Sequence, residues 1–250
     1  MSGHSKWATI KRKKAVTDGK RGRLFTVIIK EVTIAARMGG GDLKGNPRLR
    51  LAIDKAKAAN MPADNIKRAI QKGTGELPGI MYEDVTYEGF GPGGVAMIIE
   101  SVTDNKNRTV SEIRNMFERN NGKLGAANSV AWMFHRKGIM HILKANHNED
   151  ELLSVALDAG ADDMRTDEEM YEIVTTPDQF EAVKQTIESK GIKLEDAEVL
   201  LIPENIVKVE GKEAERVLRL MESLEEHEDV QHVSSNFDID EKTIASFNAG

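Results

Sequence analysis

Residues 82–104, "YEDVTYEGFGPGGVAMIIESVTD", mark the place where the sequence pattern changes from helical to extended. Segments rich in Tyr, Val and Ile flank a cluster of glycines, which predicts two strands joined by a wide turn. Such glycines also occur in phosphate-binding loops. Those loops, however, lead from a strand into a helix, whereas this one leads into a second strand. We therefore expect a structural turn that opens an α+β region.

Three helices are predicted upstream of this point. Leu24, Ile28 and Val32 are spaced four apart and form one apolar face of the first helix. Pro47 and Pro62 suit the first positions of a second and a third helix, because proline is tolerated where no backbone donor is needed. The sequence therefore predicts a small helical bundle, preceded by a basic arm without clear periodicity.

Downstream, strands and helices alternate in the order β-α-β-β-α-β twice, which predicts two ferredoxin-like units. Thr109 and Glu112 have the spacing of a capping box at the start of one helix. Residues 129–143, "SVAWMFHRKGIMHIL", are interpreted as a hairpin with a tight turn at residues 136–138. A long acidic helix and a final strand follow near the C-terminus.

Charge is distributed very unevenly along the chain. Residues 1–75 contain 18 Lys and Arg against 5 Asp and Glu, a balance of +13, whereas residues 151–250 contain 9 against 26, a balance of −17. The formal net charge of the whole chain is −6. A segment this basic attracts polyanions, chiefly nucleic acid, and the acidic segment repels them.

Arg23, Lys30 and Arg37 follow one another at intervals of seven, which puts them on one side of the first helix over about 21 Å. A row of this kind could follow a phosphate backbone. Trp7, among lysines, could stack on a base or could pack against the bundle and anchor the arm. The candidate nucleic-acid contacts are Lys6, Trp7, Lys11, Arg12, Lys13, Lys14, Lys20, Arg21, Arg23, Lys30, Arg37, Arg48, Arg50, Lys55, Arg68 and Lys72.

One further candidate lies outside the helical region. Residues 103–109, "TDNKNRT", join a strand to a helix start, where Arg108 beside free backbone N–H groups could hold a phosphate. The alternative, which we favour, is a hydrogen-bonded turn and helix cap.

Several classes of function are not supported by the sequence. The chain has no Cys, which excludes disulfides, cysteine-based zinc sites and cysteine nucleophiles. His135 and His141 fit no metal-binding spacing, and no Walker or G-x-S-x-G motif occurs. No apolar run is long enough to span a membrane, and the N-terminus lacks the apolar core of a secretory signal. We therefore predict a cytoplasmic protein that is not an enzyme, with no metal, no cofactor and no small-molecule substrate.

Five stretches, in this order, carry a family resemblance: "MSGHSKW" at 1–7, "NPRLR" at 46–50, "ANMP" at 59–62, "YEGFGPGG" at 87–94 and "TDNKNRT" at 103–109. Together they resemble the YebC/PmpR family of probable transcriptional regulatory proteins, whose mitochondrial relatives are translational activators. The resemblance implies a cytoplasmic protein in bacteria, with DNA binding and, for some members, a ribosomal role.

The resemblance also implies three domains, with the third inserted into the second. Combined with the patterns above, it predicts an α+β fold with a basic arm and helical bundle at 1–78. A middle α+β domain follows at 79–135 plus 205–250, and an inserted acidic α+β domain lies at 136–204.

Two functions remain as hypotheses. The first is a transcriptional regulator that binds DNA through the basic N-terminal domain. The second is a ribosome-associated translation factor that uses the same face on ribosomal RNA. The sequence shows no clear helix-turn-helix pattern, which weakens the argument for sequence-specific recognition of DNA. With 5% aromatic residues, it also offers no aromatic sheet for stacking single-stranded bases.

Overall fold

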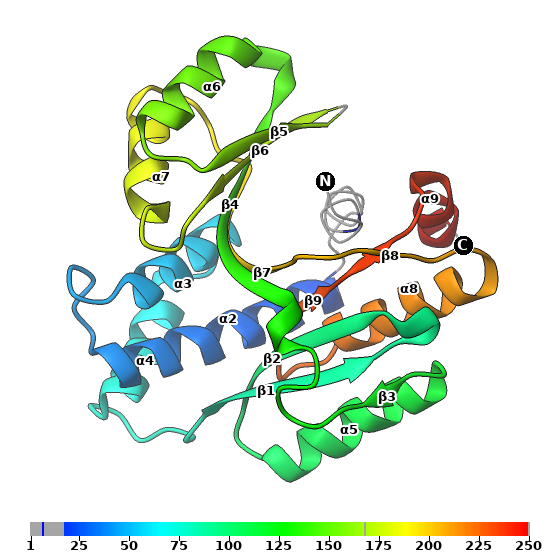
Figure 1. Ribbon diagram of the computed structural model, residues 1–250. Helices are drawn as coiled ribbons and strands as arrows, with labels where there is room; N and C mark the ends of the chain where they lie inside the picture. Colours follow the sequence, from blue (N-terminus) through cyan, green and yellow to red (C-terminus); the bar gives the residue numbers. More distant parts are fainter. Residues whose placement is uncertain (1–6, 8–17, 168, 250) are drawn as a thin grey trace.

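The computed structural model describes Trp7, residues 18–167 and residues 169–249 (Figure 1). A helical domain lies beside two four-stranded antiparallel sheets, each covered by helices on one face. This arrangement confirms the predicted α+β class and the order of a helical domain followed by two α+β units. Within the described residues, no helix is both long and apolar enough to cross a bilayer.

The helical domain contains α2 (Asp18–Gly39), α3 (Pro47–Ala58) and α4 (Ala63–Thr74). Val32, Leu49 and Ala69 belong to its common core. The side chain of Asn46 caps α3 by accepting from the Leu49 N–H at 3.0 Å, as expected for Asn at this position. Gly73 lies within α4, where a Cβ atom would collide with the Thr33 carbonyl oxygen of α2. Glycine here allows the two helices to approach closely.

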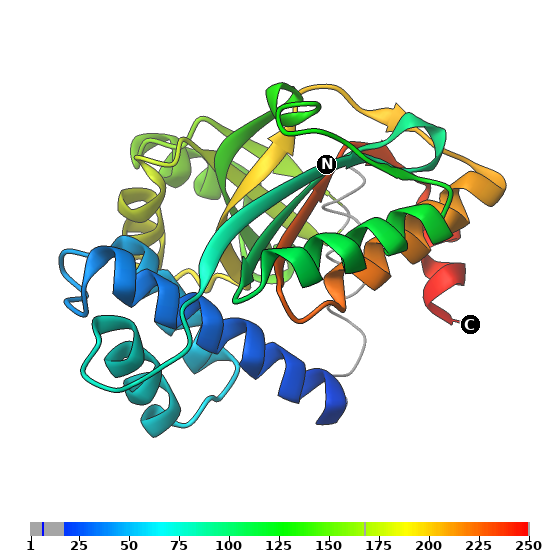
Figure 2. The ribbon, with the colours of Figure 1, turned by 90° about the horizontal axis from the view of Figure 1, so that it is seen from below.

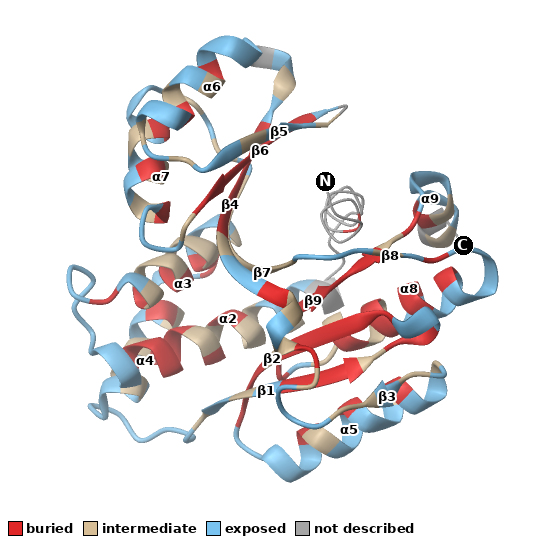
Figure 3. Cartoon of the chain, in the orientation of Figure 1, coloured by how far each residue is buried: buried red, intermediate tan, exposed pale blue. Residues whose placement is uncertain are grey.

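The first sheet has the strand order β3-β1-β2-β9. Its elements are β1 (Glu83–Phe90), β2 (Ala96–Thr103), α5 (Lys106–Arg119), β3 (Lys123–Leu124), α8 (Gly211–Glu225) and β9 (Val230–Ser235). The glycine-rich stretch forms the turn between β1 and β2, including the 3-10 helix η1 (Pro92–Gly94), as predicted. Figure 2 shows α5 and α8 side by side beneath this sheet. Figure 3 shows that β2 is buried along nearly its whole length, whereas β1 is buried only toward its C-terminal end.

The second sheet has the strand order β5-β6-β4-β7. Its elements are β4 (Phe134–Leu143), α6 (Glu149–Asp158), β5 (Asp163–Thr166), β6 (Met170–Thr175), α7 (Phe180–Ser189) and β7 (Asp196–Pro203). The chain order and the strand order are both those of a ferredoxin-like fold. The first sheet has the same spatial arrangement of strands and helices, but its chain path begins with the β1–β2 hairpin.

The remaining elements are short. Two 3-10 helices flank β4: η2 (Ala131–Met133) and η3 (Lys144–Asn146). A parallel pair, β8 (Val207–Lys208) and β10 (Phe237–Asp238), lies beyond the second sheet in the chain. The final helix, α9 (Glu241–Ala249), packs on α8.

Two local predictions were wrong. Residues 134–143 form one continuous strand, β4, and not a hairpin, because Gly138 pairs with Thr175 on one side and Val199 on the other. Glycine is required there by packing, since a Cβ atom would collide with Thr175 and Phe180. Helix α5 begins three residues before the predicted capping box, with Asn105 as its N-cap, which leaves Thr109 inside the first turn.

Candidate nucleic-acid interface

Among the described residues, the predicted cations divide into those that are paired within the protein and those that face solvent without an ion-pair partner. Spacing alone treated all of them as one basic surface. The contacts of each helix show which members remain available for a polyanion.

Three cations of helix α2 contact groups of the protein outside the helical domain. Arg23 donates to the His227 carbonyl oxygen at 3.2 Å, and Arg37 donates to the Tyr82 carbonyl oxygen at 3.1 Å. Lys30, which is only 7% exposed, forms an ion pair with Asp229 at 2.6 Å. The spacing of seven correctly places the three on one side of the helix. That side is a contact between domains, so the prediction that Lys30 belongs to an open row is wrong.

Asp229 is the centre of this contact. Its carboxylate also accepts from the hydroxyls of Thr109 at 2.6 Å and Thr103 at 3.1 Å, and from Arg108 at 2.9 Å. Burial alone would raise the pKa of Asp229, but hydrogen bonds from Lys30, Thr109 and Arg108 hold it well below its usual range. The helical domain is thereby joined to the middle domain through a buried charge cluster.

Arg108 is part of the same cluster. Its guanidinium bonds Asp104 at 2.8 Å in addition to Asp229, and the hydrogen bond to Asp229 raises the pKa of Arg108. Its backbone N–H donates to the side chain of Asn105, the N-cap of α5. These contacts support the turn-and-cap alternative for residues 103–109, and they leave Arg108 a poor phosphate ligand.

The cations at the start and middle of α3 also join domains. Arg48 bonds Glu31 and Asp84, each at 2.7 Å, and its hydrogen bond to Asp84 raises the pKa of Arg48. Two further pairs reach the second sheet and its helices: Arg50 with Glu181 at 3.5 Å, and Lys55 with Glu198 at 2.9 Å. Arg48, Arg50 and Lys55 therefore have structural partners in the protein.

Trp7 is completely buried in the core cluster that contains the inward face of α8. Its indole N–H donates to Glu225 at 2.9 Å, and its ring lies 6.1 Å from that of Phe247 in α9. The packing alternative is the one the structure shows, and base stacking on Trp7 is wrong for this structure. Other candidates of the arm lie outside the described residues: Lys6, Lys11, Arg12, Lys13, Lys14 and the Lys20 side chain.

The cations of helix α4 differ from the paired cations of α3 in their exposure to solvent. Lys67, Arg68 and Lys72 are all exposed, whereas Ile66 and Ala69 on the same helix are buried. Within the described part of the chain, none of the three has an ion-pair partner. We call these three residues the α4 row. They extend over about 7.5 Å of helix axis, at 1.5 Å per residue.

Two more exposed cations lie earlier in the chain than the α4 row. Lys57 in α3 has no ion pair among the described residues, and Arg21 in α2 lies 5.9 Å from the ring of Phe25. The set of candidate contacts left out Lys67, and also Lys57, although Lys57 follows Arg50 at the spacing of seven. The signal that could have found them is the position of each residue opposite the apolar face of its own helix.

In the described residues, no group of three or more His, Asp or Glu side chains could hold a metal ion. His135 and His141 do not converge on a shared site. His135 is exposed and lies 3.6 Å from Glu204. His141 is buried, with Asp196 at 2.8 Å and Glu172 at 3.3 Å.

The fold and this distribution of cations define a multidomain α+β protein whose helical domain carries an exposed basic helix. Two family models match the chain: "TACO1/YebC protein N-terminal domain" over residues 5–76 and "TACO1/YebC second and third domain" over residues 82–237. The chain belongs to the TACO1/YebC family, as the five motifs predicted. It is a family of regulatory proteins and not of enzymes.

Relatives and a solved structure agree with this assignment. The chain is 52% identical over 250 residues to a probable transcriptional regulatory protein of Prosthecochloris aestuarii, covering 100% of both chains. It is 56% identical over 245 residues to one from Desulfotalea psychrophila, covering 98% of both. A crystal structure of a conserved hypothetical protein from Aquifex aeolicus superposes with a TM-score of 0.82 at 44% identity, covering 89% of this chain and 92% of the other.

Proposed function

We propose that this transcriptional regulatory protein binds DNA through its helical domain and that the α4 row is the central contact. The observation that supports the proposal is the contrast between two neighbouring helices. Arg23, Lys30 and Arg37 of α2 contact groups of the protein, whereas the cations of α4 face solvent and have no paired carboxylate among the described residues.

Binding of this kind is electrostatic. Lys67, Arg68 and Lys72 act as point charges that displace counterions from the phosphate backbone. The excess of carboxylates in residues 151–250 repels the same backbone, so a bound duplex is directed toward the helical domain. Phosphate contacts position a protein but carry no sequence information. Any preference among promoters then depends on DNA shape or on contacts outside the α4 row.

The test is the triple substitution Lys67→Ala, Arg68→Ala and Lys72→Ala. At 0.15 M salt, loss of three phosphate contacts weakens duplex binding by about 10²-fold, because each contact contributes a salt exponent of about 0.9. A matched control replaces Lys212, Arg216 and Arg219, which are three exposed cations on the acidic helix α8. We expect the control to bind within twofold of wild type. Equal binding by the α4 variant and wild type would falsify the proposal.

The alternative function is a ribosome-associated translation factor. It is favoured by the same observation, because cations that contact only phosphates suit structured RNA as well as duplex DNA. The two functions separate when purified wild type is compared on a candidate promoter and on shuffled DNA of equal length. A specificity ratio near one, with ribosome co-sedimentation that the α4 variant loses, supports the translation factor. A high ratio without co-sedimentation supports the regulator.

A further inference from the structure

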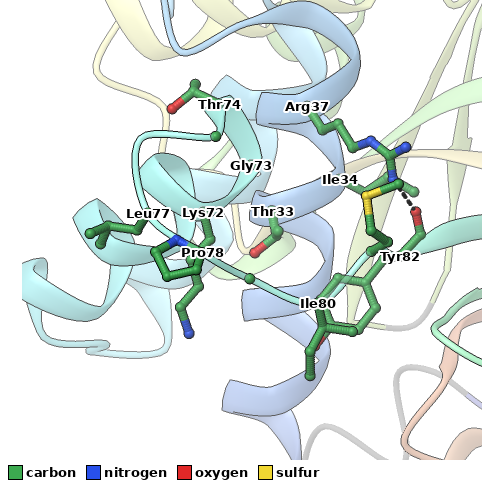
Figure 4. Close-up of a pocket in the computed structure, with 13 residues that line it drawn as sticks. Thr33, Ile34, Arg37, Lys72, Gly73, Thr74, Leu77, Pro78, Ile80 and Tyr82 are labelled. Carbon is green, nitrogen blue, oxygen red and sulfur yellow. Dashed lines mark hydrogen bonds between the residues drawn. The ribbon is translucent and has the colours of Figure 1, made fainter.

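A cavity of about 390 Å³ opens between α2, the end of α4 and the segment that leads to β1 (Figure 4). Its volume falls within the range of small-molecule pockets, roughly 300–1,000 Å³. Ile34, Leu77 and Ile80 give it apolar walls, and Tyr82 adds an aromatic ring. Arg37 and Lys72 are its two cations, and none of the residues that line it is acidic.

Part of the apolar wall of the cavity is exposed to solvent, although burial of its side chains would be favourable. Ile80 is 58% exposed and Met81 is 67% exposed, although they are consecutive residues in an ordered segment between two domains. Neighbouring apolar side chains left in water beside a cavity mark a surface that gains free energy when a ligand covers it.

The same segment has unused backbone groups. Among the described residues, no backbone hydrogen bond involves the N–H or carbonyl of Gly79, Ile80 or Met81, since β1 begins only at Glu83. Extended backbone of this kind presents donors and acceptors that can pair with the polar edge of a flat heterocycle. The cavity thus offers apolar contact area, an aromatic ring and polar backbone groups in one place.

Charge connects the cavity to the α4 row. Lys72 belongs to both, and Arg37, which donates one N–H to the Tyr82 carbonyl oxygen, has further N–H groups available from its guanidinium. A phosphate chain that follows Lys67, Arg68 and Lys72 therefore arrives at the mouth of the cavity.

We propose that the cavity receives one unstacked nucleotide of the nucleic acid whose backbone the α4 row holds. The base lies against Ile34, Ile80 and the ring of Tyr82, and Arg37 and Lys72 contact the adjoining phosphates. This inference rests on the proposed nucleic-acid binding and adds that the protein prefers a site with a bulged or unpaired nucleotide over a continuous duplex.

The test uses the full-length protein and hairpins of RNA and DNA that carry a single 2-aminopurine, either bulged or base-paired. Wild type should bind the bulged form of at least one hairpin 10-fold or more tightly, with a change in 2-aminopurine fluorescence on binding. Ile80→Glu places a carboxylate at the cavity, and this variant should lose the preference. Ile206→Glu is a matched control, because Ile206 is also 58% exposed and lies in the middle domain. The control should keep the preference.

Tyr82→Leu provides a second variant that keeps an apolar side chain but removes the ring, and its preference should fall several-fold. Equal binding of bulged and paired hairpins by wild type, or an unchanged preference in Ile80→Glu, overturns the inference and leaves the α4 row standing. Equal binding of every hairpin by wild type and by the α4 variant overturns the proposed function itself. The two failures are therefore distinguishable.

Discussion

At the scale of single residues, Asp229 decides how the helical domain meets the first sheet. It is buried and accepts hydrogen bonds from Lys30 of α2, Thr109 and Arg108 of α5, and Thr103 of β2. The partners come from two domains, so the loss of one carboxylate affects both. A buried ion pair is costly to break from one side, because the remaining charge is left without a partner in a poorly solvated place.

Replacement of Asp229 by Asn should lower the free energy of unfolding at pH 7 by about 3–5 kcal/mol, because it leaves the Lys30 ammonium buried and unpaired. Chemical denaturation with two spectroscopic probes measures the effect. The control is Asp104→Asn, which removes the exposed partner of the same Arg108 and should cost less than about 1 kcal/mol. Similar costs for the two variants would contradict the central role of Asp229.

The pH dependence of the Asp229 effect has a defined direction. The folded-state pKa of Asp229 is lowered relative to the value of about 3.9 for an unfolded aspartate. Its contribution to stability is therefore complete above that value and is lost as the pH falls toward the folded-state pKa. We expect the difference in stability between wild type and Asp229→Asn to be constant from about pH 7 to pH 5 and to shrink below about pH 4. If the difference in stability between wild type and Asp229→Asn increased on acidification, the prediction would be contradicted.

The two tryptophans differ sharply in environment, since Trp7 is fully buried and Trp132 is 66% exposed. In a Trp132→Phe variant, the emission of Trp7 should be blue-shifted and resistant to acrylamide. In Trp7→Phe, the emission of Trp132 should be red-shifted and readily quenched. Added duplex should leave the Trp7 emission unchanged, because Trp7 packs on α8 and α9 and does not stack on bases. Quenching of Trp7 by nucleic acid would restore the stacking alternative.

At the scale of elements, sequence patterns predicted where the helices of the N-terminal domain lie, but they did not predict which sides of those helices remain exposed to solvent. The periodicity of Leu24, Ile28 and Val32 reports that α2 has a buried side. It does not report that the opposite domain covers a second side of α2, where Arg23 and Lys30 lie. That information depends on contacts between residues about 200 positions apart, such as Lys30 with Asp229. A basic row at helical spacing is therefore ambiguous until the neighbouring domain is placed.

The role of a glycine is also hard to predict from sequence, because it depends on contacts with distant parts of the chain. Gly138 is read from sequence as a turn residue, but in the structure it lies in the middle of β4, under the ring of Phe180 from α7. Gly138→Ala should destabilise the protein by about 3 kcal/mol, since the added methyl group cannot be accommodated without moving α7. Gly22→Ala is the control in α2, where no atom lies within 4 Å of the added Cβ. That variant should stabilise by about 0.5–1 kcal/mol, and thermal unfolding measures both.

At the scale of the whole molecule, the fold class and its order of parts could be predicted, because five motifs and two alternating α+β patterns cover most of the chain. The site could be predicted only as a region. Net charge identified the basic N-terminal segment, but four of its cations, Lys30, Arg48, Arg50 and Lys55, hold domains together through Asp229, Asp84, Glu181 and Glu198. The surface that remains for a polyanion is correspondingly smaller than the charge of +13 suggests.

Salt dependence measures how many of these cations a nucleic acid contacts. The logarithm of affinity falls with the logarithm of salt concentration by about 0.9 per phosphate on duplex DNA. If the α4 row makes three contacts, the triple substitution of Lys67, Arg68 and Lys72 by Ala should make the slope less negative by about 2.7 between 50 and 300 mM salt. The melting temperature should not change, because these side chains have no ion-pair partners among the described residues.

Two further variants make this salt measurement decisive. The control substitutions at Lys212, Arg216 and Arg219 of α8 should leave the slope at the wild-type value, because like charges on the acidic segment keep the backbone away from them. Substitution of Lys30 by Ala should lower the melting temperature but leave the slope of the folded protein unchanged, since its ammonium is already paired with Asp229. If Lys30→Ala reduced the slope while the α4 variant did not, the phosphates would lie along α2, and the domain contact seen here would have to open on binding.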